Sequence, residues 1–116
     1  MAVTIYHNPR CSKSRQTLEL LEARGIKPRI VEYLKSPPDH ITLKSLLHKL
    51  GMPASALVRR KEQEFKALEL DRPGTSEDAF LDALVSHPRL LERPIVVSGR
   101  KARVGRPPEA VLEILP

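Results

Sequence analysis

Residues 3–15 read Val-Thr-Ile-Tyr-His-Asn-Pro-Arg-Cys-Ser-Lys-Ser-Arg, and this stretch contains the only cysteine of a 116-residue chain. Its first four residues are mostly apolar or β-branched and are typical of a strand, which we expect over about residues 2–6. The leucines that follow recur near one face of a helix, which we expect over about residues 12–24. Cys11 therefore lies where a strand ends and a helix begins.

The position of Cys11 favours a reactive thiolate. Unpaired backbone N–H groups and the positive end of the helix dipole lie at a helix N-terminus, and both stabilise an anion. Arg10, Lys13 and Arg15 add positive charge, and His7 adds a fourth charge when it is protonated. Such surroundings bring the pKa of a cysteine from near 8.5 to roughly 3.5–7.5. We therefore expect a nucleophile, although an isolated cysteine is more often a small buried hydrophobic residue.

The composition indicates a single folded domain. Of the 116 residues, 41% are hydrophobic and 29% are charged, and this length suits one modest core. No apolar run approaches the roughly 20 residues that span a bilayer, and no signal peptide precedes the first strand. We therefore expect a cytoplasmic protein that does not bind membranes. One cysteine cannot form an internal disulfide, so any disulfide of Cys11 must form with another molecule.

The net charge of +6 suggests an anionic partner. Nucleic acid is a poor fit, because only 3% of the residues are aromatic and such a chain has few side chains on which bases can stack. A small anion or a solvated surface explains the charge better, so we expect no nucleic-acid partner. His40, His48 and His87 are scattered along the chain, and we expect no bound metal.

The sequence pattern in the middle of the chain predicts a second strand followed only by helices. Residues 28–34 are rich in β-branched and aromatic types, and the helix before them makes this strand parallel to the first. Residues 39–91 are expected to be helical throughout. A leucine-rich helix ends at Gly51, a short helix that opens at Pro53 continues irregularly to residue 70, and another helix covers about residues 76–86.

The last part of the chain predicts two strands and a helix. Residues 94–98 and 101–104 are separated by a Gly-Arg pair, which indicates an antiparallel hairpin. Pro107 or Pro108 then opens the final helix. The plan is βαβ, an all-helical insert, then ββα, which gives one α/β domain over residues 1–116 with a four-stranded mixed sheet flanked by helices. Ligands of βαβ units gather at the carboxyl ends of the strands, where the cysteine lies.

This plan resembles the thioredoxin fold, in which a reactive cysteine follows the first strand. Glutaredoxins often carry Cys-x-x-Cys at that place, whereas Ser14 takes the fourth position here, and they lack the helical insert. Three motifs are more specific: Tyr-His-Asn-Pro-x-Cys-x-x-Ser-Arg at residues 6–15, Arg-Pro-Ile-Val-Val at 93–97 and Arg-Pro at 106–107. With these motifs, essentially the whole chain is similar to the glutaredoxin-coupled arsenate reductase family.

The resemblance implies an activity and the residues that perform it. Cys11 matches the family's catalytic cysteine, and His7 matches a histidine that helps to hold the thiolate. We expect Ser14 to act with them, as a first-turn hydroxyl that bonds the thiolate. Arsenate is the implied substrate, glutathione the co-substrate and glutaredoxin the protein partner, with no bound cofactor.

The resemblance also implies an oxyanion site made of arginines. Its members match Arg59, Arg93 and Arg106. Arg60 directly follows Arg59 and could be confused with it. Planar guanidinium groups suit this task because they bind tetrahedral oxyanions through paired, charge-assisted hydrogen bonds. Without the family match, these arginines would be read as ordinary exposed residues. In thioredoxin-like folds the proline before the third strand is usually cis and faces the cysteine, which implies a cis Pro94.

Two other functions fit the same residues. A glutaredoxin-like thiol transferase needs only one cysteine and would act on glutathione mixed disulfides. An Spx-type regulator shares the fold but binds RNA polymerase, and the single cysteine and the three candidate arginines argue against it. The best-known arsenate reductases read Cys-Gly-Thr-Ser where this chain reads Cys-Ser-Lys-Ser, so we expect Lys13 to sharpen thiolate activation or to change anion selectivity.

Overall fold

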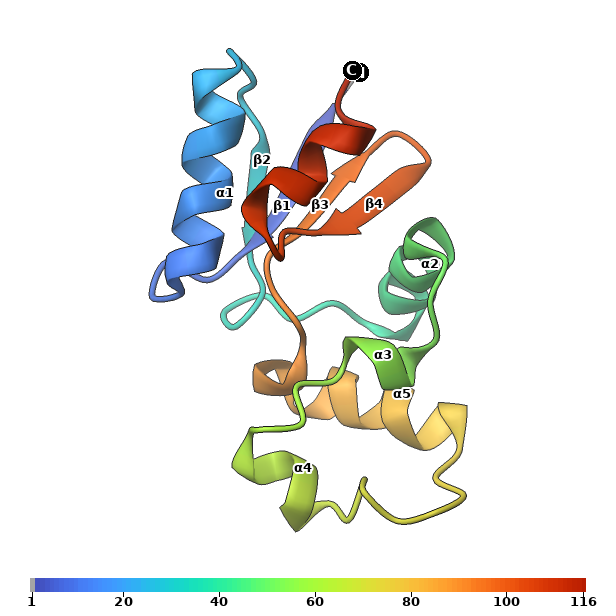
Figure 1. Cartoon of the computed structure of the whole chain (residues 1–116). Coiled ribbons are helices and arrows are strands. Elements are labelled where there is room, and N and C mark those ends of the chain that lie inside the picture. The colour runs from blue at the N-terminus through green and yellow to red at the C-terminus, as the bar shows by residue number, and fades with distance from the viewer. Residues whose placement is uncertain (1) are drawn as a thin grey trace. The chain divides into compact units, whose positions relative to one another are not determined.

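The structure is a computed structural model that describes residues 2–116 (Figure 1). The chain divides into two compact units, of which the first comprises the chain up to Ser36 together with Arg93–Pro116. The second unit is Pro37–Glu92, close to the insert expected at residues 39–91. That both units form one domain stays a prediction. No helix within residues 2–116 is both long enough and apolar enough to cross a membrane.

The first unit is a four-stranded mixed sheet with the strand order β2-β1-β3-β4. Its strands are β1 (Val3–His7), β2 (Arg29–Glu32), β3 (Ile95–Ser98) and β4 (Lys101–Val104). β1 pairs with β2 in parallel and with β3 antiparallel, and β3 pairs antiparallel with β4. The expected sheet is confirmed, but β2 is shorter than predicted. The chain turns after it, where the Glu32 carbonyl accepts the N–H groups of Lys35 and Ser36.

Two helices complete the first unit: α1 (Ser12–Ala23) and the 3₁₀ helix η2 (Pro108–Ile114). One core joins them to the sheet, and it consists of Val3, Ile5, Leu21, Val96 and Val111. Figure 1 shows α1 and the red C-terminal helix beside the strands. The last helix is a 3₁₀ rather than an α-helix, and its first turn closes with a bond from the Ala110 N–H to the Pro107 carbonyl. With seven residues, η2 is long for a 3₁₀ helix, a type that usually spans no more than about four residues.

The second unit consists of short helices. They are α2 (His40–Leu50), α3 (Ala54–Leu57), α4 (Gln63–Ala67), α5 (Glu77–Ser86) and the 3₁₀ turn η1 (Pro88–Leu90). α2 begins at Asp39, whose side chain accepts the Thr42 N–H at 2.8 Å. It ends at Gly51 with φ +68°, a left-handed conformation that costs glycine little. Gly51 therefore ends the helix as predicted.

The segment after α3 does not continue as an irregular helix, as the sequence pattern predicted. Val58 instead forms an antiparallel bridge with Leu91, and the Arg59 N–H donates to the Leu90 carbonyl at 2.7 Å. The chain becomes helical again only at α4. The pattern could not show this break, because the partners of the extended segment come from a distant part of the sequence.

A substitution of Leu21 tests this description of the core, because none of the Leu21 surface is exposed. Leu21→Ala should lower the free energy of unfolding by about 2–5 kcal/mol, since it removes buried methyl groups and leaves a cavity. Leu34→Ala is the matched control, because Leu34 is 41% exposed and its truncation should cost less than about 1 kcal/mol. Urea denaturation measures both values, and equal losses would contradict the central position of Leu21.

Candidate active site

The loop between β1 and α1 carries Cys11 and is folded by local hydrogen bonds. The Cys11 N–H donates to the Asn8 carbonyl at 2.9 Å, and the Asn8 side chain accepts the Arg10 N–H at 3.0 Å. Asparagine suits such turns because its side chain can replace a backbone acceptor. Arg15 Nη1 donates to the Pro9 carbonyl at 2.9 Å and ties the loop to the first turn of α1. Sequence analysis missed the role of Asn8, for which its place in the motif was the only signal.

Cys11 directly precedes α1 as its N-cap residue and has extended backbone angles. Burial of its sulfur is the largest single influence and raises the pKa of Cys11. The backbone N–H of Ser14, the Arg93 side chain, the backbone N–H of Lys13 and the charge of Arg106 all lower it. Together they outweigh burial, so the pKa of Cys11 lies below the ordinary thiol value.

Two arginines from the end of the chain meet at this sulfur. Arg106 Nη2 lies 3.7 Å from Cys11 Sγ, and Arg106 Nε donates to the Arg93 carbonyl at 2.8 Å. The Arg93 side chain hydrogen-bonds the sulfur as well. Two of the three arginines predicted from the sequence are therefore brought together with the cysteine.

Both of these arginines precede a cis proline. The Arg93–Pro94 bond is cis, as the resemblance implied for Pro94. The Arg106–Pro107 bond is also cis, and no feature of the sequence predicted it. Each cis peptide bond therefore directly follows an arginine that lies at the sulfur.

Gly105 brings the Arg106 segment close to α1 and to the first cis proline. A Cβ atom at this position would lie 2.6 Å from Thr17 Oγ1 and 2.8 Å from Pro94 Cγ. Real Cβ atoms do not approach other atoms so closely, so the backbone reaches this position only as glycine unless its neighbours move. The Gly105 N–H also donates to the Pro94 carbonyl at 2.9 Å. Sequence analysis did not single out this glycine, whose only signal was its place before an Arg-Pro pair.

His7 ends β1 and contacts the serine of the Cys-x-x-Ser motif. Its Nδ1 lies 2.6 Å from Ser14 Oγ, which also accepts the Asn8 N–H at 3.1 Å. Burial is the largest influence and lowers the pKa of His7; the Glu32 charge opposes this, and the Arg15 charge adds to it. The net pKa lies below its usual value of 6.5, so His7 is mostly neutral at pH 7 and does not supply the fourth positive charge considered above.

The remaining predicted residues act on Cys11 in different ways. Ser14 is connected to the sulfur through its backbone N–H, while its hydroxyl group is bonded to His7 and Asn8. Lys13 also acts on the pKa of Cys11 through its backbone N–H. The positive charge at the sulfur comes from the arginines near the C-terminus.

Arg59 lies in the second unit, where it is paired with a carboxylate. Its Nε is 3.7 Å from Glu62 Oε1. The neighbouring Arg60 is distinguished by a different contact, since its guanidinium carbon lies 5.2 Å from the centre of the Phe65 ring, within the range of a cation–π interaction. A role for Arg59 beside the cysteine stays a prediction.

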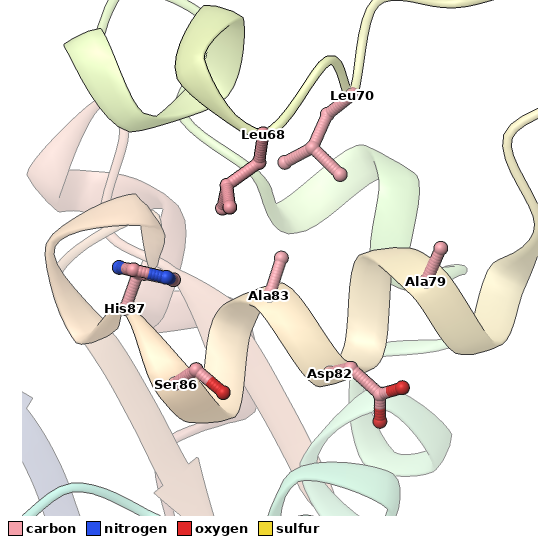
Figure 2. Close-up of a pocket in the computed structure, with 7 residues that line it drawn as sticks. All are labelled: Leu68, Leu70, Ala79, Asp82, Ala83, Ser86 and His87. Carbon is pink, nitrogen blue, oxygen red and sulfur yellow. The ribbon is translucent and has the colours of Figure 1, made fainter.

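The second unit also contains a cavity of about 260 Å³ beside α5. It is lined by Leu68, Leu70, Ala79, Asp82, Ala83, Ser86 and His87. Figure 2 shows Leu68 and Leu70 pointing toward the side of α5 that carries Ala83, whereas Asp82 points to another side of this helix. A tetrahedral anion needs several hydrogen-bond donors or cations, and apart from the Asp82 carboxylate this mostly apolar lining offers only the side chains of Ser86 and His87. This cavity is therefore a poor candidate for an oxyanion site.

Comparisons with known proteins agree on one family. The ArsC family model matches residues 6–114. The chain is 55% identical over 114 residues to the uncharacterized protein YfgD of Escherichia coli (strain K12), covering 97% of this chain and 96% of that protein. It is 50% identical over 114 residues to an arsenate reductase of Neisseria meningitidis serogroup A, covering 97% of each. The solved structure of an arsenate reductase from Vibrio cholerae is 52% identical and has a TM-score of 0.96, covering 99% of this chain and 98% of that one.

The pKa of Cys11 can be measured from the pH dependence of its alkylation by iodoacetamide, because the thiolate is the reactive form. The midpoint should lie below the value for an ordinary cysteine thiol. Arg106→Ala should move it to higher pH, since the variant removes a cation 3.7 Å from the sulfur. Arg103→Ala is the control, because that guanidinium pairs with Glu113, and it should leave the midpoint in place. An unchanged midpoint in Arg106→Ala would show that this arginine does not stabilise the thiolate.

Proposed function

Because this chain belongs to the ArsC family, we propose that it is an arsenate reductase with Cys11 as its nucleophile. One observation carries the proposal: Arg106 Nη2 lies 3.7 Å from the Cys11 sulfur, with Arg93 at the same atom. Arsenate is a tetrahedral anion, and two guanidinium groups beside a thiolate provide both the binding site and the attacking group. Relatives named as arsenate reductases support the same activity.

The first step joins the enzyme to its substrate. The Cys11 thiolate attacks pentavalent arsenic, an S–As bond forms, and one As–O bond breaks so that the oxygen leaves as water after protonation. Thiolate and arsenate repel each other because both are negative. Arg93 and Arg106 reduce this repulsion, and they also stabilise the charge on the arsenate oxygens as the bond forms.

Glutathione performs the reduction in the second step. Its thiolate attacks the Cys11 sulfur of the adduct, so that an S–S bond forms while the S–As bond breaks. The electron pair of the S–As bond remains on arsenic, which becomes trivalent and leaves as arsenite. Cys11 and glutathione have then supplied the two electrons, and they remain joined as a mixed disulfide.

Glutaredoxin completes the cycle. Its thiolate attacks the glutathione sulfur of the mixed disulfide and releases the Cys11 thiolate for another turnover. The presence of only one cysteine in the chain supports this scheme, because the second and third thiols must come from other molecules. The cycle needs no bound cofactor, and it requires the reducing conditions of the cytoplasm, where we place the protein.

The other residues have supporting tasks in this proposal. Neutral His7 holds the Ser14 hydroxyl, and the first turn of α1 is thereby fixed with the Ser14 N–H at the sulfur. The resemblance to the family assigns the third guanidinium of the oxyanion site to Arg59. Pro94 fixes the direction of the chain after Arg93, the residue that hydrogen-bonds the sulfur.

The test is NADPH oxidation coupled through glutathione reductase, with glutathione and glutaredoxin present, with and without arsenate, and with arsenite quantified as the product. Cys11→Ser should abolish the arsenate-dependent rate and leave the fold intact. Arg93→Ala should lower kcat/KM for arsenate by about 10- to 100-fold, because it removes a charged donor from the site. Arg24→Ala, an exposed arginine in the same unit, is the control and should retain the wild-type rate.

Two results would contradict the proposal. The first is arsenate reduction at the wild-type rate by Cys11→Ser. The second is the absence of any arsenate-dependent rate in a protein whose Cys11 is rapidly alkylated. In the second case, turnover of a glutathionylated peptide would assign a thiol transferase activity instead.

A further inference from the structure

The pairing of β3 with β4 extends past the ends of both strands toward the cysteine. Pro94 directly precedes β3 and Gly105 directly follows β4, so these two residues lie opposite each other in the register of the hairpin. The Gly105 N–H donates to the Pro94 carbonyl at 2.9 Å. One position farther along are Arg93 and Arg106, where Arg106 Nε donates to the Arg93 carbonyl at 2.8 Å. The place of Arg106 therefore depends on where the backbone of Gly105 lies.

Gly105 is also close to Thr17, in the middle of α1. A Cβ atom on Gly105 would lie 2.6 Å from Thr17 Oγ1 and 2.8 Å from Pro94 Cγ. Thr17 cannot easily give way, because none of its surface is exposed and its hydroxyl donates to the Lys13 carbonyl at 2.8 Å. Pro94 is a buried ring. Only a residue without a side chain therefore fits between these neighbours in their present positions.

Contacts, rather than backbone conformation, oppose a side chain at Gly105. The φ angle of Gly105 is not positive, whereas that of Gly25 is +76°. Gly25 has the opposite surroundings, since no atom lies within 4 Å of the place of its Cβ. Alanine at Gly25 would be strained by its backbone angles, and alanine at Gly105 by its neighbours. The first unit thus contains two glycines that differ in the reason for which they are needed.

Thr17 belongs to the same helix that supplies donors to the sulfur. Its hydroxyl bonds the carbonyl of Lys13, and the N–H groups of Lys13 and Ser14 lower the pKa of Cys11. The regular geometry of a helix holds these donors and Thr17 at a fixed spacing. The contact between Thr17 and Gly105 therefore determines how closely the segment after β4 approaches the helix that carries these donors.

We propose that Gly105 is a positioning residue of the site, whose close contact with Thr17 sets the distance between Arg106 and the Cys11 sulfur. A side chain at this position would push the segment after β4 away from α1. Arg106 Nη2 lies 3.7 Å from the sulfur and would move with that segment. The consequence for arsenate rests on the proposed function, in which Arg106 binds the oxyanion. The consequence for the thiolate does not.

The pH dependence of Cys11 alkylation by iodoacetamide tests the inference without arsenate. Gly105→Ala should move the midpoint to higher pH, as expected for Arg106→Ala, because the cation then lies farther from the thiolate. In the coupled assay, kcat/KM for arsenate should fall by about 10- to 100-fold, since a misplacement of about 1 Å can have an effect of this size. An unchanged midpoint in a folded Gly105→Ala protein would overturn the inference. A shifted midpoint without any arsenate-dependent rate would support the positioning role and reject the proposed function.

Gly25→Ala is the matched control, because it makes the same substitution in the same unit. It should lower the melting temperature, since alanine opposes a positive φ, and it should leave the alkylation midpoint and kcat/KM unchanged. Thermal unfolding of both variants measures the loss of stability separately. If Gly25→Ala shifts the midpoint as far as Gly105→Ala does, the shift reports a general loosening of the fold, and the role assigned to Gly105 is wrong.

Two double variants identify the route of the effect. In an Arg106→Ala background, Gly105→Ala should add little to the midpoint, because the cation that it displaces is already absent. A full additional shift would show that Gly105 does not act through Arg106.

In a Thr17→Ala background, Gly105→Ala should shift the midpoint less than it does in the wild type, since the closest contact of the new Cβ has been removed. A shift of the same size in both backgrounds would exclude Thr17 from the positioning role. This background also replaces the single variant if Gly105→Ala does not fold. The double variant should still have a higher midpoint than Thr17→Ala, because the contact with Pro94 remains, and equal midpoints would overturn the inference.

Discussion

The negative charge of the Cys11 thiolate must be stabilised, and groups of the first unit stabilise it. A half-buried thiolate is unfavourable unless donors and cations surround it, and here they come from distant parts of the chain. The N-terminal turn of α1 supplies backbone N–H groups, and the segments beside β3 and β4 supply Arg93 and Arg106. The antiparallel pairing of β1 with β3 brings these segments together, so the anion site requires these two strands to be paired.

Local sequence signals predicted much of this architecture because local interactions determine it. Gly51 ends α2 as a left-handed residue, and this signal depends on neighbouring positions only. The hairpin of β3 and β4 is likewise encoded by its short turn. The positions of Cys11, Arg93 and Arg106 in one site were predicted from the resemblance of three motifs, since nothing local relates residues so far apart.

The features that sequence reasoning missed depend on contacts between distant segments. Val58 is extended rather than helical because Leu91 offers it a backbone partner. Gly105 matters because α1 and Pro94 leave no room for a Cβ atom. The lowered pKa of His7 follows mainly from its burial, and burial is a property of the folded sheet. In each case the residue type permits the outcome, and the tertiary structure decides it.

The short outer strands of the sheet bear on how the protein avoids aggregation. β2 and β4 are the edges, and each is only four residues long. Both carry charged residues: Arg29 and Glu32 in β2, and Lys101 and Arg103 in β4. Edge strands that are short and charged are poor templates for a strand of another chain, because pairing would remove water from the charged side chains and gain few hydrogen bonds. The sheet that precedes and follows the Cys11 loop is thus protected at both of its edges against pairing with other copies of the chain.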